Sequence, residues 1–137
     1  MIVVDASVAV QWVADEDTSE LSETLLSRND LIAPDLLLVE VANALYRKVF
    51  VGDISEQHAA LGLAFVRDKV DLLGATVDRL SRAIAFANEM NHPVYDCLYL
   101  VIAEEMDARV ATYDQELISR ARYPGKGALI AELPLPP

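Results

Sequence analysis

Acidic residues stand at two points of the sequence where a carboxylate has a chemical use. Asp5 directly ends a short β-branched run, and Asp114 follows a second apolar run, 109–112, by one residue. Both positions are typical of the carboxyl end of a buried strand, and open parallel sheets bind ligands beyond those ends. Either aspartate could instead only cap the helix that follows it.

Two further acids lie in segments that otherwise read as buried helices. Glu40 interrupts the apolar run 36–41, and Asp96 precedes the apolar run 97–102. Acidic side chains are seldom buried without a partner. The local alternatives are an intrahelical pair with Arg47 or a solvated edge for Glu40, and for Asp96 the general preference of acids for a helix N-terminus.

These acids indicate a particular chemistry if the fold brings them together. Carboxylates that share one cleft repel one another, and their pKa values rise unless a cation neutralises them. The chain has one cysteine and two histidines, so we expect oxygen ligands, which suit Mg²⁺ or Mn²⁺. Such a cation activates water and stabilises charge in phosphodiester hydrolysis. The sequence therefore predicts nuclease chemistry at Asp5, Glu40, Asp96 and Asp114.

The elements that must position these acids alternate between strand and helix. We expect strands at 2–4, 31–33, 72–77, 109–112 and 128–131, and helices at 6–13, 17–27, 35–51, 55–70, 78–90, 94–106 and 114–122. Segments 35–51 and 55–70 should form a helical hairpin. The alternation predicts a three-layer α/β/α domain around a central parallel sheet of about four to five strands.

Composition limits the class of protein. The chain has 137 residues, of which 53% are hydrophobic, and this size favours one domain, 1–131, followed by a proline-rich tail, 132–137. Its apolar runs are short of the roughly 18 to 20 residues that cross a bilayer, and no Lys or Arg precedes Asp5. We expect a cytoplasmic protein without a membrane contact. We interpret Cys97 as a buried structural thiol and His58 and His92 as surface residues.

Short segments that contain the four acids occur in one order along the chain. They are VVDAS at 3–7, EVANAL at 40–45, YDC at 95–97 and TYD at 112–114. Together they make the chain similar to PIN domains, and more narrowly it resembles the VapC toxins of bacterial type II toxin-antitoxin pairs. The resemblance runs from Ile2 to about Ile130.

The resemblance implies a Mg²⁺- or Mn²⁺-dependent endoribonuclease, with the same four acids as its catalytic and metal-binding cluster. Ser7 and Thr112 match the small hydroxyl residues that orient carboxylates or water, and Asn43 matches a polar position one turn beyond the glutamate. The resemblance also implies a homodimer and a VapB-type antitoxin whose C-terminal segment lies across the active-site groove.

The net charge bears on how such a protein holds RNA. Twenty-two acidic and eleven basic residues give a formal charge of −11, which opposes nonspecific binding to phosphate backbones. The last third of the chain is neutral and supplies the candidate RNA-binding residues, Arg109, Arg120, Arg122 and Lys126, each of which could equally belong to a solvated face. Trp12 could contact an antitoxin helix or stack a base, although a place in the core is commoner for tryptophan.

Two other classes of function share some of these features. A strand followed by an aspartate also opens small-molecule phosphohydrolases, but Ser7 stands where such phosphatases need a second aspartate. Alternatively, the acids could bind a structural metal ion or a basic partner in a non-catalytic interaction subunit.

Overall fold

A four-stranded parallel sheet forms the centre of the computed structural model, which describes residues 1–14 and 22–131. The strands are β1 (Ile2–Val4), β2 (Leu31–Pro34), β3 (Asp71–Leu73) and β4 (Arg109–Ala111), in the order β3-β2-β1-β4. The expected parallel α/β sheet is therefore confirmed.

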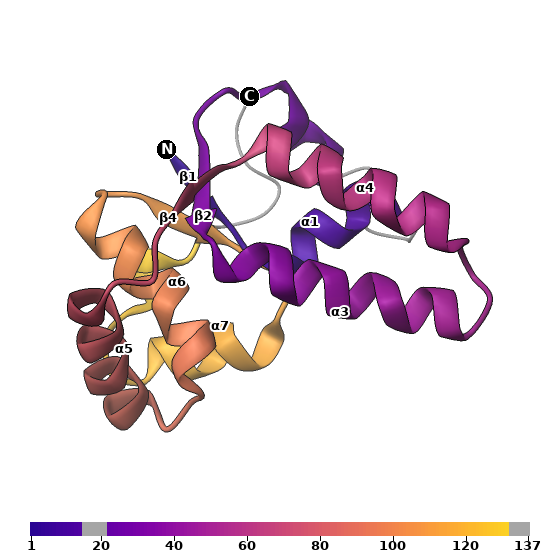
Figure 1. Ribbon diagram of the computed structural model, residues 1–137. Coiled ribbons are helices and arrows are strands. Elements are labelled where there is room, and N and C mark those ends of the chain that lie inside the picture. Colours follow the sequence, from indigo (N-terminus) through magenta and orange to yellow (C-terminus); the bar gives the residue numbers. More distant parts are fainter. Residues whose placement is uncertain (15–21, 132–137) are drawn as a thin grey trace.

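Helices cover this sheet on both faces. They are α1 (Ala6–Val13), α3 (Leu36–Phe50), α4 (Glu56–Lys69), α5 (Val77–Met90), α6 (Val94–Glu105) and α7 (Gln115–Arg122). Figure 1 shows α1, α3 and α4 on one side of the strands and α5, α6 and α7 on the other. Helices α3 and α4 pack as the expected hairpin.

Local chemistry sets the helix ends. The Ser55 hydroxyl accepts a hydrogen bond from the His58 amide at 3.0 Å, which caps α4. Thr76 caps α5 in the same way, through the Arg79 amide at 3.2 Å. At the other end of α5, Asn91 adopts the left-handed conformation, with φ of 51°, and ends the helix.

The structure corrects three expected elements. The strand expected at 72–77 is only Asp71–Leu73, because Thr76 caps a helix that begins at Val77. The segment 128–131 is not a strand: it holds a 3-10 turn, Gly127–Leu129, and one bridge between Val110 and Ile130. Of the helix expected at 17–27, residues 17–21 lie outside the described ranges, and the rest ends in a 3-10 turn, Thr24–Ser27.

Helix α6 is the centre of the core. Its residues from Cys97 to Ala103 are all buried, and it packs against β1, β2 and β4. Cys97 is fully buried, as expected, and burial raises the pKa of its thiol to about 11. A helix buried on every side cannot rotate without breaking core contacts, so the residues at its N-terminus are held in place.

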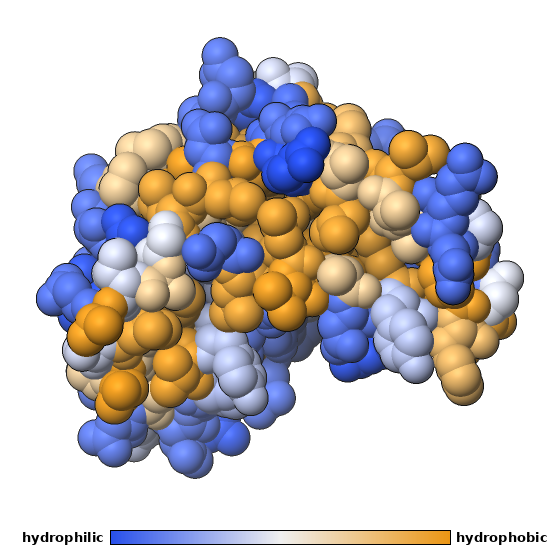
Figure 2. All heavy atoms as spheres, viewed as in Figure 1, coloured by the Kyte–Doolittle hydropathy of each residue, from blue (hydrophilic) through white to orange (hydrophobic). Residues whose placement is uncertain are grey.

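Apolar side chains also reach the surface. Val39 of α3 and Val77 of α5 are 66% and 83% exposed, and Figure 2 shows apolar atoms gathered across the middle of the face seen in Figure 1. No helix in the described part of the chain is long and apolar enough to span a bilayer.

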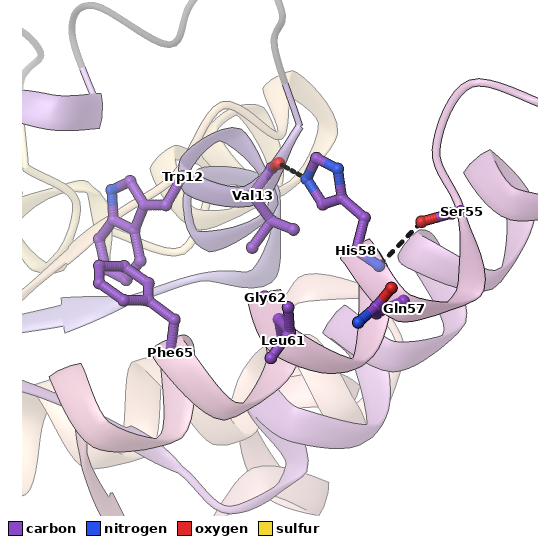
Figure 3. A pocket seen from close by; sticks show the side chains of 8 residues that line it. All are labelled: Trp12, Val13, Ser55, Gln57, His58, Leu61, Gly62 and Phe65. Atoms are coloured by element: carbon purple, nitrogen blue, oxygen red, sulfur yellow. Dashed lines mark hydrogen bonds between the residues drawn. The ribbon is translucent and has the colours of Figure 1, made fainter.

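A close contact joins α1 to α4. Figure 3 shows Gly62 of α4 directly beneath Val13 of α1, and a Cβ added to Gly62 would lie 2.1 Å from Val13 Cγ1. Because valine is stiff at χ1, Val13 cannot easily move aside. A glycine at this position therefore lets the two helices approach.

We expect Gly62→Ala to destabilise the protein by about 1–2 kcal/mol, since overpacking costs about 1–3 kcal/mol and exceeds the gain in helix propensity of about 1 kcal/mol. Urea unfolding measures this difference. In a Val13→Ala background the same change should cost far less. Gly74→Ala is the matched control, because nothing lies within 4 Å of its added Cβ. A Gly62→Ala protein as stable as the parent would contradict the packing argument.

Candidate active site

Asp5 and Asp114 lie at the same end of adjacent strands. Val4 of β1 pairs with Ala111 of β4, and the amide of Asp5 donates a hydrogen bond to the Ala111 carbonyl at 3.1 Å. This register sets Asp5 beside the first residues after β4. The expected position beyond the carboxyl ends of the strands is confirmed for both aspartates.

Two hydroxyl groups hold the Asp5 carboxylate. Thr112 Oγ1 donates to Asp5 Oδ2 at 2.6 Å, and Ser7 Oγ donates to the same oxygen at 2.9 Å. Asp5 is 6% exposed and Thr112 is 2% exposed. Ser7 and Thr112 therefore orient a nearly buried carboxylate.

The same hydroxyl groups shape the loop that carries Asp114. Ser7 Oγ accepts from the Tyr113 amide at 2.9 Å, and Thr112 Oγ1 accepts from the Asp114 amide at 3.0 Å. Asp114 Oδ1 in turn accepts from two backbone amides of the first turn of α7. Asp114 is thus a helix cap, as the local alternative held, and it caps the helix from a place beside the other acids.

Glu40 reaches the site from α3. Its side chain is half-buried, and Tyr99 Oη donates a hydrogen bond to Glu40 Oε1 at 2.7 Å. Its partner is therefore a tyrosine on another helix. The sequence reasoning missed Tyr99, although it follows Asp96 by three residues and so shares a helix face with it. Burial and the nearby carboxylates raise the pKa of the Tyr99 hydroxyl, so it remains a donor.

Asp96 lies in the first turn of α6 and contacts a histidine. His92 Nε2 is 2.7 Å from Asp96 Oδ2. The expectation that His92 is a surface residue is wrong, since its side chain is only 4% exposed. The left-handed Asn91 reverses the chain, and the His92 amide donates back to Ala87 O, so the turn directs the imidazole inward. His58 does lie on the surface.

The electrostatics join the four acids into one cluster. Burial is the largest cause of a raised pKa at Asp5, Glu40 and Asp96. Like charges add to it: Asp96 acts on Asp5, and both act on Glu40. The charge of Asp114 likewise raises the pKa of Asp96. Asp5, Glu40 and Asp96 therefore act on one another across one site, and Asp114 joins it through Asp96.

The other predicted residues lie in different settings. Asn43 is exposed on α3, and Arg109, Arg120 and Arg122 are exposed in the last third of the chain. Lys126 is engaged: its Nζ lies 3.4 Å from Glu89 Oε2 and 3.8 Å from the centre of the Phe86 ring. Trp12 is half-buried, and its indole donates to the Ser22 carbonyl at 2.9 Å.

The donor set fits a hard divalent cation. Carboxylate oxygens are the ligands that Mg²⁺ and Mn²⁺ prefer, and positive charge here would offset the burial and the like charges that raise the pKa values. Among the described residues, one polar atom from each of His92, Asp96 and Asp114 lies within 4.8 Å of the others, so the two carboxylates are close enough to share an ion; Asp5 and Glu40 do not belong to this tight group.

Comparisons with known proteins agree on one family. The family model described as "PIN domain" matches residues 2–123. "Ribonuclease VapC3" of Pyrobaculum aerophilum is 30% identical over 87% of this chain and 93% of its own. "Ribonuclease VapC1" of Mycobacterium tuberculosis is 32% identical over 89% of this chain and 92% of its own.

Solved structures share the fold at lower identity. PAE2754 of Pyrobaculum aerophilum superposes with a TM-score of 0.72 at 23% identity, covering 88% of this chain and 84% of its own. The toxin VapC20 of Mycobacterium tuberculosis, described as cleaving the sarcin-ricin loop, superposes with a TM-score of 0.73 at 13% identity, covering 87% of this chain and 94% of its own.

We expect Asp5→Asn to stabilise the metal-free protein at pH 8 by on the order of 1 kcal/mol, or about 3–5 °C in melting temperature. Above its raised pKa the native carboxyl is ionised in an unfavourable setting, whereas asparagine carries no charge. The difference should shrink as the pH falls toward the ordinary aspartate value of 3.8, because the folded protein then holds the proton.

Thermal melts in a chelator from pH 8 to pH 4 test this, with the exposed Asp53→Asn as the matched control. A lower melting temperature for Asp5→Asn at pH 8 would show that the Asp5 charge favours the fold, contrary to the account.

Proposed function

Because the chain belongs to the PIN domain family, we propose that it is a metal-dependent endoribonuclease that acts as the toxin of a toxin-antitoxin pair. Two of its relatives, at 30% and 32% identity over most of both chains, are named ribonucleases of the VapC group. The observation that carries the proposal is the placement of Asp5, Glu40, Asp96 and Asp114 at one edge of the sheet, where burial first and like charge second raise the pKa values of Asp5, Glu40 and Asp96.

We propose that these four carboxylates hold Mg²⁺, for which Mn²⁺ substitutes. When bound, a divalent cation supplies positive charge that activates water and stabilises negative charge on the phosphate under attack. The protein supplies orientation: Ser7 and Thr112 fix Asp5, and Tyr99 fixes one oxygen of Glu40. Fixed carboxylates need no rearrangement during the reaction, which is how a preorganised site lowers a barrier.

The alternatives from the sequence have less support. A small-molecule phosphohydrolase and a non-catalytic metal-binding subunit both fit an acidic cluster. Neither is expected from a chain whose relatives at 30% and 32% identity are named ribonucleases and that has the complete acidic set. Turnover of a phosphate monoester, or metal binding without cleavage of any RNA, would favour them.

A hollow beside the acids offers a path for the RNA backbone. It has a volume of about 400 Å³, and its lining includes Ser7 of α1, Tyr113, and the two cations Arg47 and Lys48 of α3. Ser7 also contacts Asp5. Many other basic residues are engaged elsewhere, since the described ion pairs include those of Arg28, Arg67, Arg79, Arg82 and Lys126.

Phosphate groups next to the cut bond would therefore meet Arg47 in a chain that is otherwise strongly acidic. Local positive charge is what positions a nucleic-acid backbone. The exposed Arg109, Arg120 and Arg122 remain candidates for more distant contacts with the RNA, whereas Lys126 is the least suited because Glu89 and Phe86 engage it.

Two protein partners belong to the proposal. The C-terminal segment of a VapB-type antitoxin would lie across the active-site groove, and an antitoxin helix could contact Trp12 in the hollow of about 570 Å³ between α1 and α4, whose lining also includes Leu61 and Phe65 (Figure 3). A homodimer could cover exposed apolar residues such as Val39 of α3 and Ile84 of α5, which are 66% and 61% exposed; Figure 2 shows apolar side chains gathered on one face of the molecule. Such apolar surface is typical of interfaces.

The test of activity is cleavage of a mixed RNA pool by purified protein with Mg²⁺ or Mn²⁺. We expect Asp96→Asn and Asp5→Asn to lower turnover by on the order of 10²- to 10³-fold, the scale on which one electrostatic group of an active site acts. A chelator should abolish cleavage, and the exposed Asp53→Asn should leave it unchanged. Full activity in both active-site variants would refute the proposal.

The test of the RNA path is Arg47→Gln. We expect it to raise KM by about 5- to 10-fold at low salt with kcat unchanged, and to make the dependence of KM on salt concentration less steep, because one phosphate contact is lost. Arg67→Gln is the matched control, an exposed arginine of α4 that pairs with Asp68. Equal effects of both variants would mean that only net charge matters.

A further inference from the structure

We propose that His92 is a positioning residue, whose Nε2–H group holds the Asp96 carboxylate in the orientation in which it binds the divalent cation. The inference rests on the proposed function in one respect only, that Asp96 is a ligand of that cation. It concerns a residue outside the four acids, in the turn between α5 and α6.

The geometry defines the bond that His92 makes. The imidazole Nε2 lies 2.7 Å from Asp96 Oδ2, and the His92 side chain is 4% exposed. An ionised carboxylate can only accept hydrogen bonds, so Nε2 carries the proton in this pair.

The rest of the ring has no evident role in the fold. Among the residues that the structure describes, Nδ1 is a buried nitrogen without a hydrogen-bond partner. Buried polar atoms are usually satisfied, and an unsatisfied one is unfavourable for stability. An apolar side chain would fill this space without that penalty. The bond to Asp96 therefore gives the reason for a histidine here.

The position of the pair links it to the acidic cluster. Ligand atoms of His92, Asp96 and Asp114 lie within 4.8 Å of one another. The imidazole occupies Asp96 Oδ2, and within the described ranges Oδ1 accepts no hydrogen bond, so Oδ1 is the oxygen left to bind a cation. Hydrogen bonds of this outer kind fix the orientation of metal ligands, and their loss lowers metal affinity by about 10- to 100-fold.

A pair of variants separates positioning from packing. His92→Leu keeps the bulk and removes the donor, whereas His92→Gln places an amide N–H near the position of Nε2. We expect His92→Leu to raise the Kd for Mn²⁺ by about 10- to 100-fold while the melting temperature of the metal-free protein stays the same or rises. His92→Gln should bind Mn²⁺ within about threefold of the parent. Calorimetric titration with Mn²⁺ and melts in a chelator give these values.

A double-variant cycle shows whether His92 acts through Asp96. In an Asp96→Asn background, His92→Leu should cause no further loss of Mn²⁺ affinity, because the group it orients is already changed. Electron spin echo spectra of bound Mn²⁺ in the parent should lack the coupling of a directly coordinated nitrogen.

Several outcomes would overturn the inference. The first two are a Mn²⁺ affinity that does not depend on residue 92 and a failure of His92→Gln to restore Mn²⁺ binding. The others are a metal-free His92→Leu protein that melts well below the parent and a nitrogen coordinated directly to Mn²⁺. RNA cleavage by the parent, measured in parallel, keeps the two proposals apart. Cleavage with an affinity independent of His92 contradicts only the inference, whereas His92-dependent binding without cleavage contradicts only the proposed function.

Discussion

The burial of like-charged carboxylates at one edge of the sheet is the constraint on which the rest of the structure depends. Three helix N-termini, those of α1, α6 and α7, point their partial positive charge toward this edge, beside Asp5, Asp96 and Asp114. Hydrogen bonds from Ser7, Thr112, Tyr99 and His92 supply further donors. These donors do not offset the burial and like charge of the site, because the pKa values of Asp5, Glu40 and Asp96 remain raised. A cation is the natural counterpart.

The elements that carry the acidic residues are apolar and rigidly packed, and they hold this unfavourable arrangement in place. Helix α6 has buried side chains from Cys97 to Ala103 and lies against three strands. Asp96 and Tyr99 on this helix therefore keep fixed positions relative to β1. Stability gained in the core thus offsets a site that is poor for stability on its own. The same reasoning explains a buried His92 with an unsatisfied nitrogen.

The strands and the meeting of Asp5 with Asp114 were predictable from the sequence, because both depend on the pattern of apolar and acidic residues. A β-branched run ending at Asp5 and an apolar run before Asp114 predict neighbouring parallel strands, and the strand register then brings both aspartates together. The partners of Glu40 and Asp96 were not predictable in this way. Tyr99 looked like one more apolar position of a buried helix, and His92 lay beside a proline in a turn that usually faces water. Only the tertiary structure, which brings Tyr99 of α6 within hydrogen-bond distance of Glu40 of α3, and the left-handed turn at Asn91 direct these side chains toward the acids.

The account is tested most directly by a crystal structure of the protein grown with Mn²⁺, with the ion located by anomalous scattering. It predicts a strong peak among the four acids, with oxygens of Asp5 and Asp96 at roughly 2.0–2.3 Å from the ion. A map with no peak at this edge of the sheet, or with Mn²⁺ bound only elsewhere, would contradict it.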